Sequence, residues 1–346
     1  DDISGNKSKG DTVVTTLNYD LQSVAYQSLG SYDGAVIVME PQTGKILAMV
    51  SKPDYDPNTI AADWEAINSE GSSLYNRATQ GQYAPGSTFK IFTALEYYRE
   101  HPDDYMDYQY DCTGKIVEDN STINCYKGEV HGTVNFEQSF AESCNTSFSN
   151  IGLQIDNDSF DALCNSMLFN TSLPIAFESS KSKFSLSSED SAAMTMETSI
   201  GQGKTMVSPL HMLLVTSAIC NDGVLMKPYL VDHTENVDGV VVSSSSQSQY
   251  SALLSQNESD MLESLMSAAV SYGTCSKLSG QSYSAYGKTG TAQVSDTTDQ
   301  TNAWFVGYAK KDGYNDIAIA VIVENSGAGS TYAVPIAKNV FDKYFN

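Results

Sequence analysis

The sequence predicts an α/β fold of the α+β type: a central, mainly antiparallel sheet built from both chain ends, flanked by helices, with a largely helical inserted subdomain. Two apolar runs, 34–39 and 45–50, are separated by Pro41-Gln42-Thr43-Gly44, which is typical of a hairpin turn. Near the other end, three more strand-like segments follow one another: 285–294, 303–309 and 317–324. One sheet that collects all five segments is the simplest arrangement.

Helices are predicted outside these strands, where apolar residues recur at helical spacing. The β-branched run 12–16 is followed by such a pattern over 19–29, and the chain closes with another over 332–345. A further helix fits 258–272 and stops at Gly273. These helices are expected to flank the sheet.

The inserted subdomain is placed roughly within residues 87–220, between the two groups of strands. Ser208 and Pro209 provide a capping serine and a first-turn proline for a helix over 210–219. Serine-rich polar loops are expected in two places: 179–188 and 243–248. We interpret 11–346 as one domain and 1–10 as the remnant of a polar linker.

Composition limits the classes of partner. The chain has 346 residues, of which 42 are acidic and 19 basic, so its formal net charge is −23. This charge repels nucleic acid and anionic membrane surfaces, and we predict no nucleic-acid partner. No window approaches the ~20 apolar residues of a membrane span. Any membrane anchor is therefore expected in a segment that precedes Asp1.

The six cysteines contain no Cys-x-x-Cys pair, so the sequence does not indicate zinc, and we predict no metal or organic cofactor. Cys112 and Cys125 flank a polar loop. They form a disulfide in an oxidising compartment or remain two half-buried thiols, and the spacing fits both. The histidines are scattered, and a core role is expected for His211, which lies on an apolar helix.

A candidate nucleophile stands in Tyr83-Ala84-Pro85-Gly86-Ser87-Thr88-Phe89-Lys90, directly before a helical run. Ser87 and Lys90 are three residues apart at the first helical turn, so both side chains share one face. The helix dipole there favours negative charge on the serine oxygen. The alternative is a capping serine with a solvated lysine, because Ser-x-x-Lys also occurs at 4–7 and 180–183, in polar segments.

Two further elements offer complementary chemistry. Ser143-Cys144-Asn145 provides a second hydroxyl for proton relay and an amide that can hold an ammonium group, although a turn serine and a structural asparagine also fit. Lys288-Thr289-Gly290-Thr291 lies on a predicted strand, where a glycine usually marks close approach of another molecule. Side-chain alternation places Lys288 and Gly290 on one face, and Thr289 and Thr291 on the other. A cation and hydroxyls suit a carboxylate.

Together, in this order, the three elements resemble the penicillin-binding transpeptidase domain. The resemblance extends to the hairpin segment 35–58, to 76–79 before the serine, and to two blocks at 199–203 and 303–309. The sequences Asp-Pro-Asn and Tyr-Ala-Pro-Gly-Ser-Thr-Phe-Lys are most similar to the monofunctional class B enzymes. Asn302 departs from the family pattern, which often has histidine there, and we expect altered local hydrogen bonding.

The resemblance implies a peptidoglycan D,D-transpeptidase that works through a serine acyl-enzyme. Ser87 would attack the D-Ala-D-Ala bond of a stem peptide, with Lys90 as the base and Ser143 as proton relay. The remaining roles would be these: Asn145 holds the Lys90 amine and the acyl chain, Lys288, Thr289, Gly290 and Thr291 bind the terminal carboxylate, and the backbone N–H groups of Ser87 and Thr291 form the oxyanion hole.

The same resemblance implies the partners and the location. Stem peptides ending in D-Ala-D-Ala would be substrates, and β-lactams would acylate Ser87 covalently. Proteins of a cell-wall synthesis or division complex are further candidate partners. The substrate implies the extracytoplasmic face of the bacterial membrane.

Other functions remain open at this point. A D,D-carboxypeptidase, a β-lactamase and a β-lactam sensor would carry the same three elements. A nucleotide-binding loop is a weaker alternative, suggested by Gly201-Gln202-Gly203-Lys204-Thr205; it would require a glycine where Thr198 stands and a buried strand before it.

Overall fold

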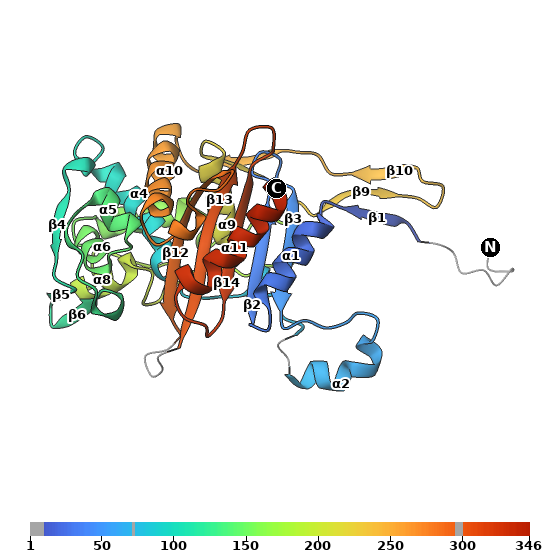
Figure 1. The fold of residues 1–346 in the computed structure, drawn as a ribbon, viewed down its shortest axis with the longest axis horizontal. Coiled ribbons are helices and arrows are strands. Elements are labelled where there is room, and N and C mark those ends of the chain that lie inside the picture. Colours follow the sequence, from blue (N-terminus) through green and yellow to red (C-terminus); the bar gives the residue numbers. More distant parts are fainter. Residues whose placement is uncertain (1–9, 71–72, 295–299) are drawn as a thin grey trace.

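The computed structural model describes residues 10–70, 73–294 and 300–346 (Figure 1). Its centre is a five-stranded antiparallel sheet with the order β12-β13-β14-β2-β3. The strands are β2 (Gly34–Met39), β3 (Ile46–Lys52), β12 (Ser284–Gln293), β13 (Thr301–Lys310) and β14 (Ile317–Val323). The two ends of the chain meet where Ala320 pairs with Ile37. The predicted sheet is therefore confirmed.

Helices cover both faces of this sheet. α1 (Tyr19–Leu29) and α11 (Gly329–Phe345) pack against each other and lie in front of the sheet in Figure 1. α9 (Pro209–Cys220) contacts β14, β13 and β2, and α10 (Gln256–Ser271) contacts β12. All twelve residues of α9 are buried, which explains why this helix is apolar all round.

The predicted helices are found within three residues of their expected limits. α11 begins at Gly329 instead of 332, because its first turn is polar and lacks apolar spacing. His211 is buried in α9 and its ring Nε2 lies 2.7 Å from the carbonyl oxygen of Met167. Burial lowers the pKa of His211 to about 4, so the ring is neutral and donates this bond. The predicted core role of His211 is confirmed.

The insertion is largely helical, as predicted, and lies beside the β12 edge of the sheet (Figure 1). Its helices are α4 (Lys90–Glu100), α5 (Phe136–Ala141), α6 (Asn145–Gly152), α7 (Asn157–Ser166) and α8 (Ala192–Ser199). It also contains two small antiparallel ladders that the sequence analysis missed: β4 (Gln109–Cys112) with β7 (Gly132–Asn135), and β5 (Lys115–Glu118) with β6 (Ser121–Asn124). Asp119 and Asn120, both left-handed, form the turn between β5 and β6.

Two parts extend from the body. A three-stranded sheet of β1 (Thr12–Thr15), β9 (Val231–Glu235) and β10 (Val241–Ser244) forms an arm, and α2 (Ile60–Glu70) lies on a separate excursion (Figure 1). β8 (Val224–Met226) and β11 (Gln249–Ala252) form a further small ladder, and β8 contacts α9. The predicted loop at 243–248 is wrong at its start, because Ser243 and Ser244 pair with β9. Among the described residues, no helix has the length and apolar character to cross a membrane.

Candidate active site

Ser87 lies at the start of a helix, as predicted, but in a tighter turn. η1 (Gly86–Phe89) is a 3-10 turn, and α4 continues directly from it. Gly86 has a φ of +53°, and a Cβ at this position would lie 2.9 Å from the carbonyl oxygen of Thr291. Glycine therefore allows the serine turn to approach β12 closely. The N–H groups of this first turn, including that of Ser87, have no partner within the helix.

Lys90 is fully buried at the first position of α4. Its Nζ donates hydrogen bonds to the carbonyl oxygen of Ser143 at 2.7 Å and to Asn145 Oδ1 at 2.8 Å, and Ser143 Oγ lies 3.3 Å from the same nitrogen. Ser87 Oγ donates to the same Asn145 Oδ1 at 3.5 Å. Within the described residues, no hydrogen bond joins Ser87 directly to Lys90, and Asn145 connects them.

The Ser143-Cys144-Asn145 segment forms the connection between α5 and α6. Ser143 has a φ of +59°, which is unusual for a residue with a side chain. Cys144 is the N-cap of α6, and its Sγ accepts a hydrogen bond from the N–H of Ser147. This geometry directs Ser143 Oγ between two amines, at 2.8 Å from Lys288 Nζ and 3.3 Å from Lys90 Nζ.

The two lysines are fully buried, and both amines contact Ser143. Burial lowers the pKa of Lys90 well below its ordinary value, and the positive charge of Lys288 lowers it further. Burial lowers the pKa of Lys288 to about 8. Each Nζ lies 5.4 Å from an aromatic ring centre, that of Phe148 for Lys90 and that of Phe140 for Lys288. Burial and the charge of Lys288 both disfavour a positive charge on Lys90.

β12 is an edge strand, and its free side faces the serine turn. Because the carbonyl oxygen of Thr291 points toward Gly86, the N–H of Thr291 lies on the same side of the strand. Gly290 leaves room for the chain's own serine turn: a Cβ there would lie 2.9 Å from the oxygen of Pro85. The close approach inferred from this glycine is therefore made within the molecule. Thr289 Oγ1 lies 2.6 Å from Thr274 Oγ1.

All the predicted site residues thus gather at one junction. Ser87 and Lys90 come from η1 and α4, Ser143 and Asn145 from the α5–α6 connection, and the others from β12: Lys288, Thr289, Gly290 and Thr291. The chain matches the family model of the penicillin binding protein transpeptidase domain over residues 34–342. The chain belongs to this family.

Several relatives agree with this assignment. Peptidoglycan D,D-transpeptidase PbpA of Mycolicibacterium smegmatis is 32% identical over 364 residues, which covers 98% of this chain and 73% of the relative. Penicillin-binding protein A from M. tuberculosis, solved as a ceftriaxone acyl-enzyme complex, has a TM-score of 0.90 at 28% identity and covers 100% of this chain and 82% of that chain. The D,D-transpeptidase domain of a peptidoglycan glycosyltransferase from Eggerthella lenta has a TM-score of 0.88 at 30% identity, covering 98% and 84%.

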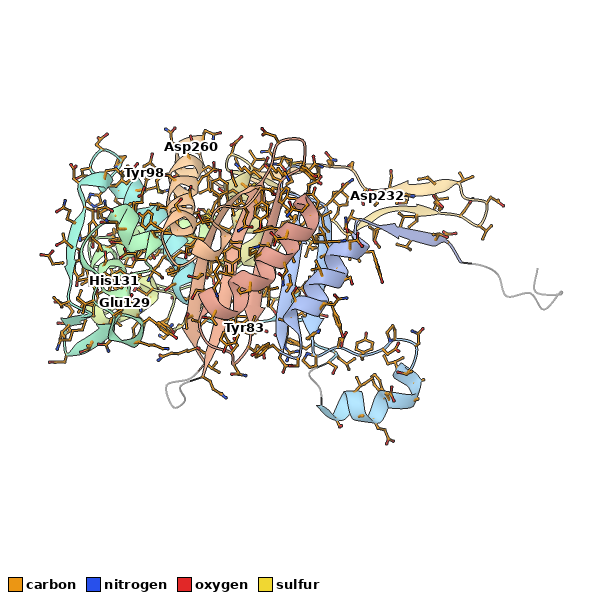
Figure 2. The ribbon with its side chains drawn as sticks, in the orientation of Figure 1. Tyr83, Tyr98, Glu129, His131, Asp232 and Asp260 are labelled. Atoms are coloured by element: carbon orange, nitrogen blue, oxygen red, sulfur yellow. The ribbon has the colours of Figure 1, made fainter. Side chains whose placement is uncertain are left out.

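In this transpeptidase domain, the flanking blocks brace the serine turn. The indole N–H of Trp304 donates to the carbonyl oxygen of Ala84 at 3.1 Å, and the N–H of Gly86 donates to the carbonyl oxygen of Gly201 at 3.0 Å. Tyr83 Oη, beside the lower end of the sheet in Figure 2, donates to Glu324 at 2.6 Å. These contacts fix the position of Ser87 relative to β12.

Two expectations about single segments can now be resolved. Asn302 is nearly buried, and its Oδ1 accepts a hydrogen bond from the N–H of Asn325 at 3.0 Å, so it stabilises a turn beside β13.

Residues 201–205 follow α8 and not a buried strand, which removes the structural context that a phosphate-binding loop requires. The nucleotide-binding alternative is wrong.

The sequence analysis missed one cluster of side chains. Cys112, Cys125, His131 and Cys144 each place one potential ligand atom within 4.8 Å of all the others. Cys112 and Cys125 are free thiols with their sulfur atoms 3.7 Å apart, so the thiol alternative holds in this structure. The sequence signal was weak because these residues are 13, 6 and 13 positions apart, without a close pair.

Proposed function

We propose that this chain is a serine D,D-transpeptidase that crosslinks peptidoglycan stem peptides and is acylated and inhibited by β-lactams at Ser87. The observation that carries the proposal is the buried Lys90 amine, held by Ser143 and Asn145 beside Ser87. A lysine whose pKa is lowered by burial can accept a proton near neutral pH. The relatives named as D,D-transpeptidases and the β-lactam acyl-enzyme structures support this reading.

In the first half-reaction, Ser87 Oγ attacks the carbonyl carbon between the two terminal D-alanines. Its proton passes to Lys90, which shares the hydrogen-bond acceptor Asn145 Oδ1 with Ser87, and the negative charge on the carbonyl oxygen is stabilised by the N–H groups of Ser87 and Thr291. Each such donor is worth ~3 kcal/mol in analogous sites. The peptide C–N bond then breaks. D-Alanine leaves with a proton that Ser143 relays from Lys90, and an ester to Ser87 remains.

In the second half-reaction, the amine of another stem peptide attacks the ester carbonyl. The amine loses a proton to Lys90 through Ser143, the new amide bond forms, the ester C–O bond breaks, and Lys90 passes that proton to Ser87 Oγ. Before the first bond breaks, the terminal carboxylate of the donor peptide is proposed to bind the hydroxyls of Thr289 and Thr291 along β12, in the positive field of Lys288, and it leaves with D-alanine. Gly290 contributes close packing of the strand against the serine turn.

A β-lactam ring presents the same carbonyl, so a fluorescent penicillin reports the first half-reaction. We expect covalent labelling of the wild-type chain, with the adduct on the peptide that contains Ser87, and no labelling of Ser87→Ala. Labelling that survives this substitution would exclude Ser87 as the nucleophile.

The lifetime of the adduct separates the transpeptidase from hydrolytic enzymes that share these residues. We expect the acyl-enzyme to persist when it is followed by intact mass. Turnover within seconds would favour a β-lactamase or D,D-carboxypeptidase instead. We also propose that the domain acts on the extracytoplasmic face of the membrane, where this substrate lies, within a cell-wall synthesis complex.

A further inference from the structure

Three thiols and one imidazole converge at the base of the β4–β7 region, which we call the cysteine lobe (residues 109–135, with Cys144 beneath it). Cys112 ends β4, Cys125 follows β6, and His131 precedes β7. Cys144 is the N-cap of α6. The four ligands thus come from four separate segments, yet their ligand atoms all lie within 4.8 Å of one another.

The distances match a tetrahedral metal site. With zinc–sulfur bonds of about 2.3 Å, two sulfurs on a tetrahedral zinc lie about 3.8 Å apart. The Sγ atoms of Cys112 and Cys125 are 3.7 Å apart, and those of Cys125 and Cys144 are 3.8 Å apart. His131 Nδ1 lies 3.4 Å from Cys112 Sγ, close to the nitrogen–sulfur edge of the same polyhedron. A disulfide would require about 2.05 Å between two sulfurs.

The histidine is oriented as a metal ligand would be. Its Nδ1 faces the sulfur atoms, and its Nε2 lies 3.7 Å from a carboxylate oxygen of Glu129. Figure 2 shows His131 and Glu129 next to each other on the lobe. A carboxylate that accepts a hydrogen bond from the outer nitrogen of a ligating histidine fixes the ring and raises its basicity, and Glu129 lies within ion-pair distance of that nitrogen.

The lobe also needs a cross-link, because it has little hydrophobic core. Between Gln109 and Val134, the buried apolar side chains are those of Cys112, Cys125 and Val134. Segments that bury so little apolar surface are commonly held by disulfides or a structural metal. Thr146, which is buried, places its hydroxyl 3.2 Å from Cys112 Sγ and completes the enclosure of the sulfur atoms.

We propose that Cys112, Cys125, His131 and Cys144 bind one structural Zn²⁺ ion. Three thiolates and an imidazole are a preferred ligand set for tetrahedral zinc, and the set leaves no coordination position for substrate. The site joins the cysteine lobe to the base of α6. It therefore holds Cys144, whose neighbours Ser143 and Asn145 contact Lys90.

Metal analysis of the untagged chain tests the site directly. After reduction, exposure to ZnCl₂ and removal of excess metal, we expect about one zinc per chain. Cys112→Ser and Cys125→Ser should lose it, whereas Cys220→Ala, at a buried cysteine in α9, should retain it. Less than about one zinc per ten wild-type chains, or full retention in both serine variants, would overturn the proposal.

Cobalt replaces zinc for a test on the wild-type chain, which is independent of whether the variants fold. We expect Co²⁺ to give the absorption of a tetrahedral centre with thiolate-to-metal charge transfer. An octahedral cobalt spectrum contradicts the site. A second contradicting result is an isolated protein whose mass is two hydrogen atoms below that of the reduced chain, combined with no uptake of metal after reduction. Glu129→Gln should weaken zinc binding about tenfold, and Glu118→Gln, an exposed residue of β5, should not.

A catalytic consequence rests on the proposed function. Removal of zinc by a chelator should slow acylation of Ser87 by a fluorescent penicillin about tenfold, and readdition of zinc should restore the rate. An unchanged rate in the metal-free protein would refute the positioning role of the metal. If the zinc-loaded chain is not labelled at all, the proposed function fails, while the metal content still decides the site.

Discussion

The two sides of the active site are stabilised in different ways. β12 belongs to a sheet whose inner strands are apolar on both faces, and every residue of β14 is buried. The cysteine lobe, on the other side, buries only three apolar side chains over 26 positions, Gln109 to Val134. Hydrophobic packing of the sheet alone can fix Lys288. Ser143 and Asn145 instead adjoin Cys144, whose position depends on the cluster of three cysteines and His131. The catalytic residues therefore depend on two kinds of stabilisation that can be disrupted separately.

Replacement of the proposed base, Lys90, should give the largest effect on acylation. Lys90 lies where the two sides of the active site meet. Lys90→Met keeps an apolar side chain of similar length but removes the amine, so acylation should fall by roughly 10³-fold. The free energy of unfolding should not decrease, because a buried amine is replaced by an apolar group. Acylation rates with a fluorescent penicillin and urea titrations measure the two quantities.

Lys183→Met is the matched control for the base. Lys183 has the same spacing to a serine, Ser180, but its side chain is exposed. Its acylation rate should equal that of the wild type. A Lys90→Met chain that is acylated at more than about a tenth of the wild-type rate would contradict the assigned role.

A core truncation should separate the sheet from the cysteine lobe. Ile319→Ala, in the fully buried β14, should lower the free energy of unfolding by about 2–5 kcal/mol. This loss of stability should be the same in the zinc-loaded protein and in the protein treated with a chelator, because Ile319 lies on the middle strand of the sheet and the thiols lie outside the sheet. Cys112→Ser should instead destabilise only the zinc-loaded protein. If a chelator changes the loss of unfolding free energy equally in Ile319→Ala and in Cys112→Ser, the sheet and the cysteine lobe unfold as one unit.

The sheet and the pair Ser87 and Lys90 were predictable because their signals are local. Alternating or continuous apolar runs mark each strand, and Ser87 and Lys90 share one helical turn. Ser143 and Lys288 could be placed only through the family resemblance, since their approach depends on tertiary packing. The missing hydrogen bond between Ser87 and Lys90, with Asn145 as the link, also could not be read from spacing.

The cysteine cluster could not be predicted for a related reason. Cys125 returns to Cys112 only because the β5–β6 hairpin folds the chain back through the left-handed Asp119 and Asn120. His131 reaches the cluster because β7 pairs with β4, where Gly132 lies opposite Cys112. Short strands of four residues carry little periodicity, so both pairings were invisible in the sequence. The Asp-Asn turn was the available signal.

Titration of Lys288 should make the stability of the sheet side depend on pH. Its pKa falls from 10.5 to about 8 on folding because of burial. Between these values Lys288 binds more protons in the unfolded chain than in the folded chain, so this residue should make stability rise with pH from about 8 toward 10.5, by ~3 kcal/mol over the full window. Urea titrations at saturating zinc measure this slope.

Lys288→Met removes one of the two buried lysines whose pKa falls on folding and should reduce the slope in that window, while the contribution of Lys90 remains. The acylation rate of the wild type should rise with pH as Lys90 loses its proton, since only the neutral amine can act as the base. A stability that falls with pH between about 8 and 10, and falls less in Lys288→Met, would mean that Lys288 gains a proton on folding.

Asn302→Ala should give the smallest loss of stability, and this loss should be confined to the sheet side of the active site. The change removes the acceptor for the N–H of Asn325, a residue with a φ of +48°, and should cost about 1 kcal/mol. Zinc content should be unchanged, and acylation should change less than about threefold, because Trp304 still holds Ala84 through its indole N–H. Asn302→Asp retains the acceptor oxygen and should recover most of the lost stability at neutral pH. If the aspartate variant is as unstable as the alanine variant, the hydrogen bond is not the reason that this position is asparagine, and the packing of its amide against β14 becomes the explanation.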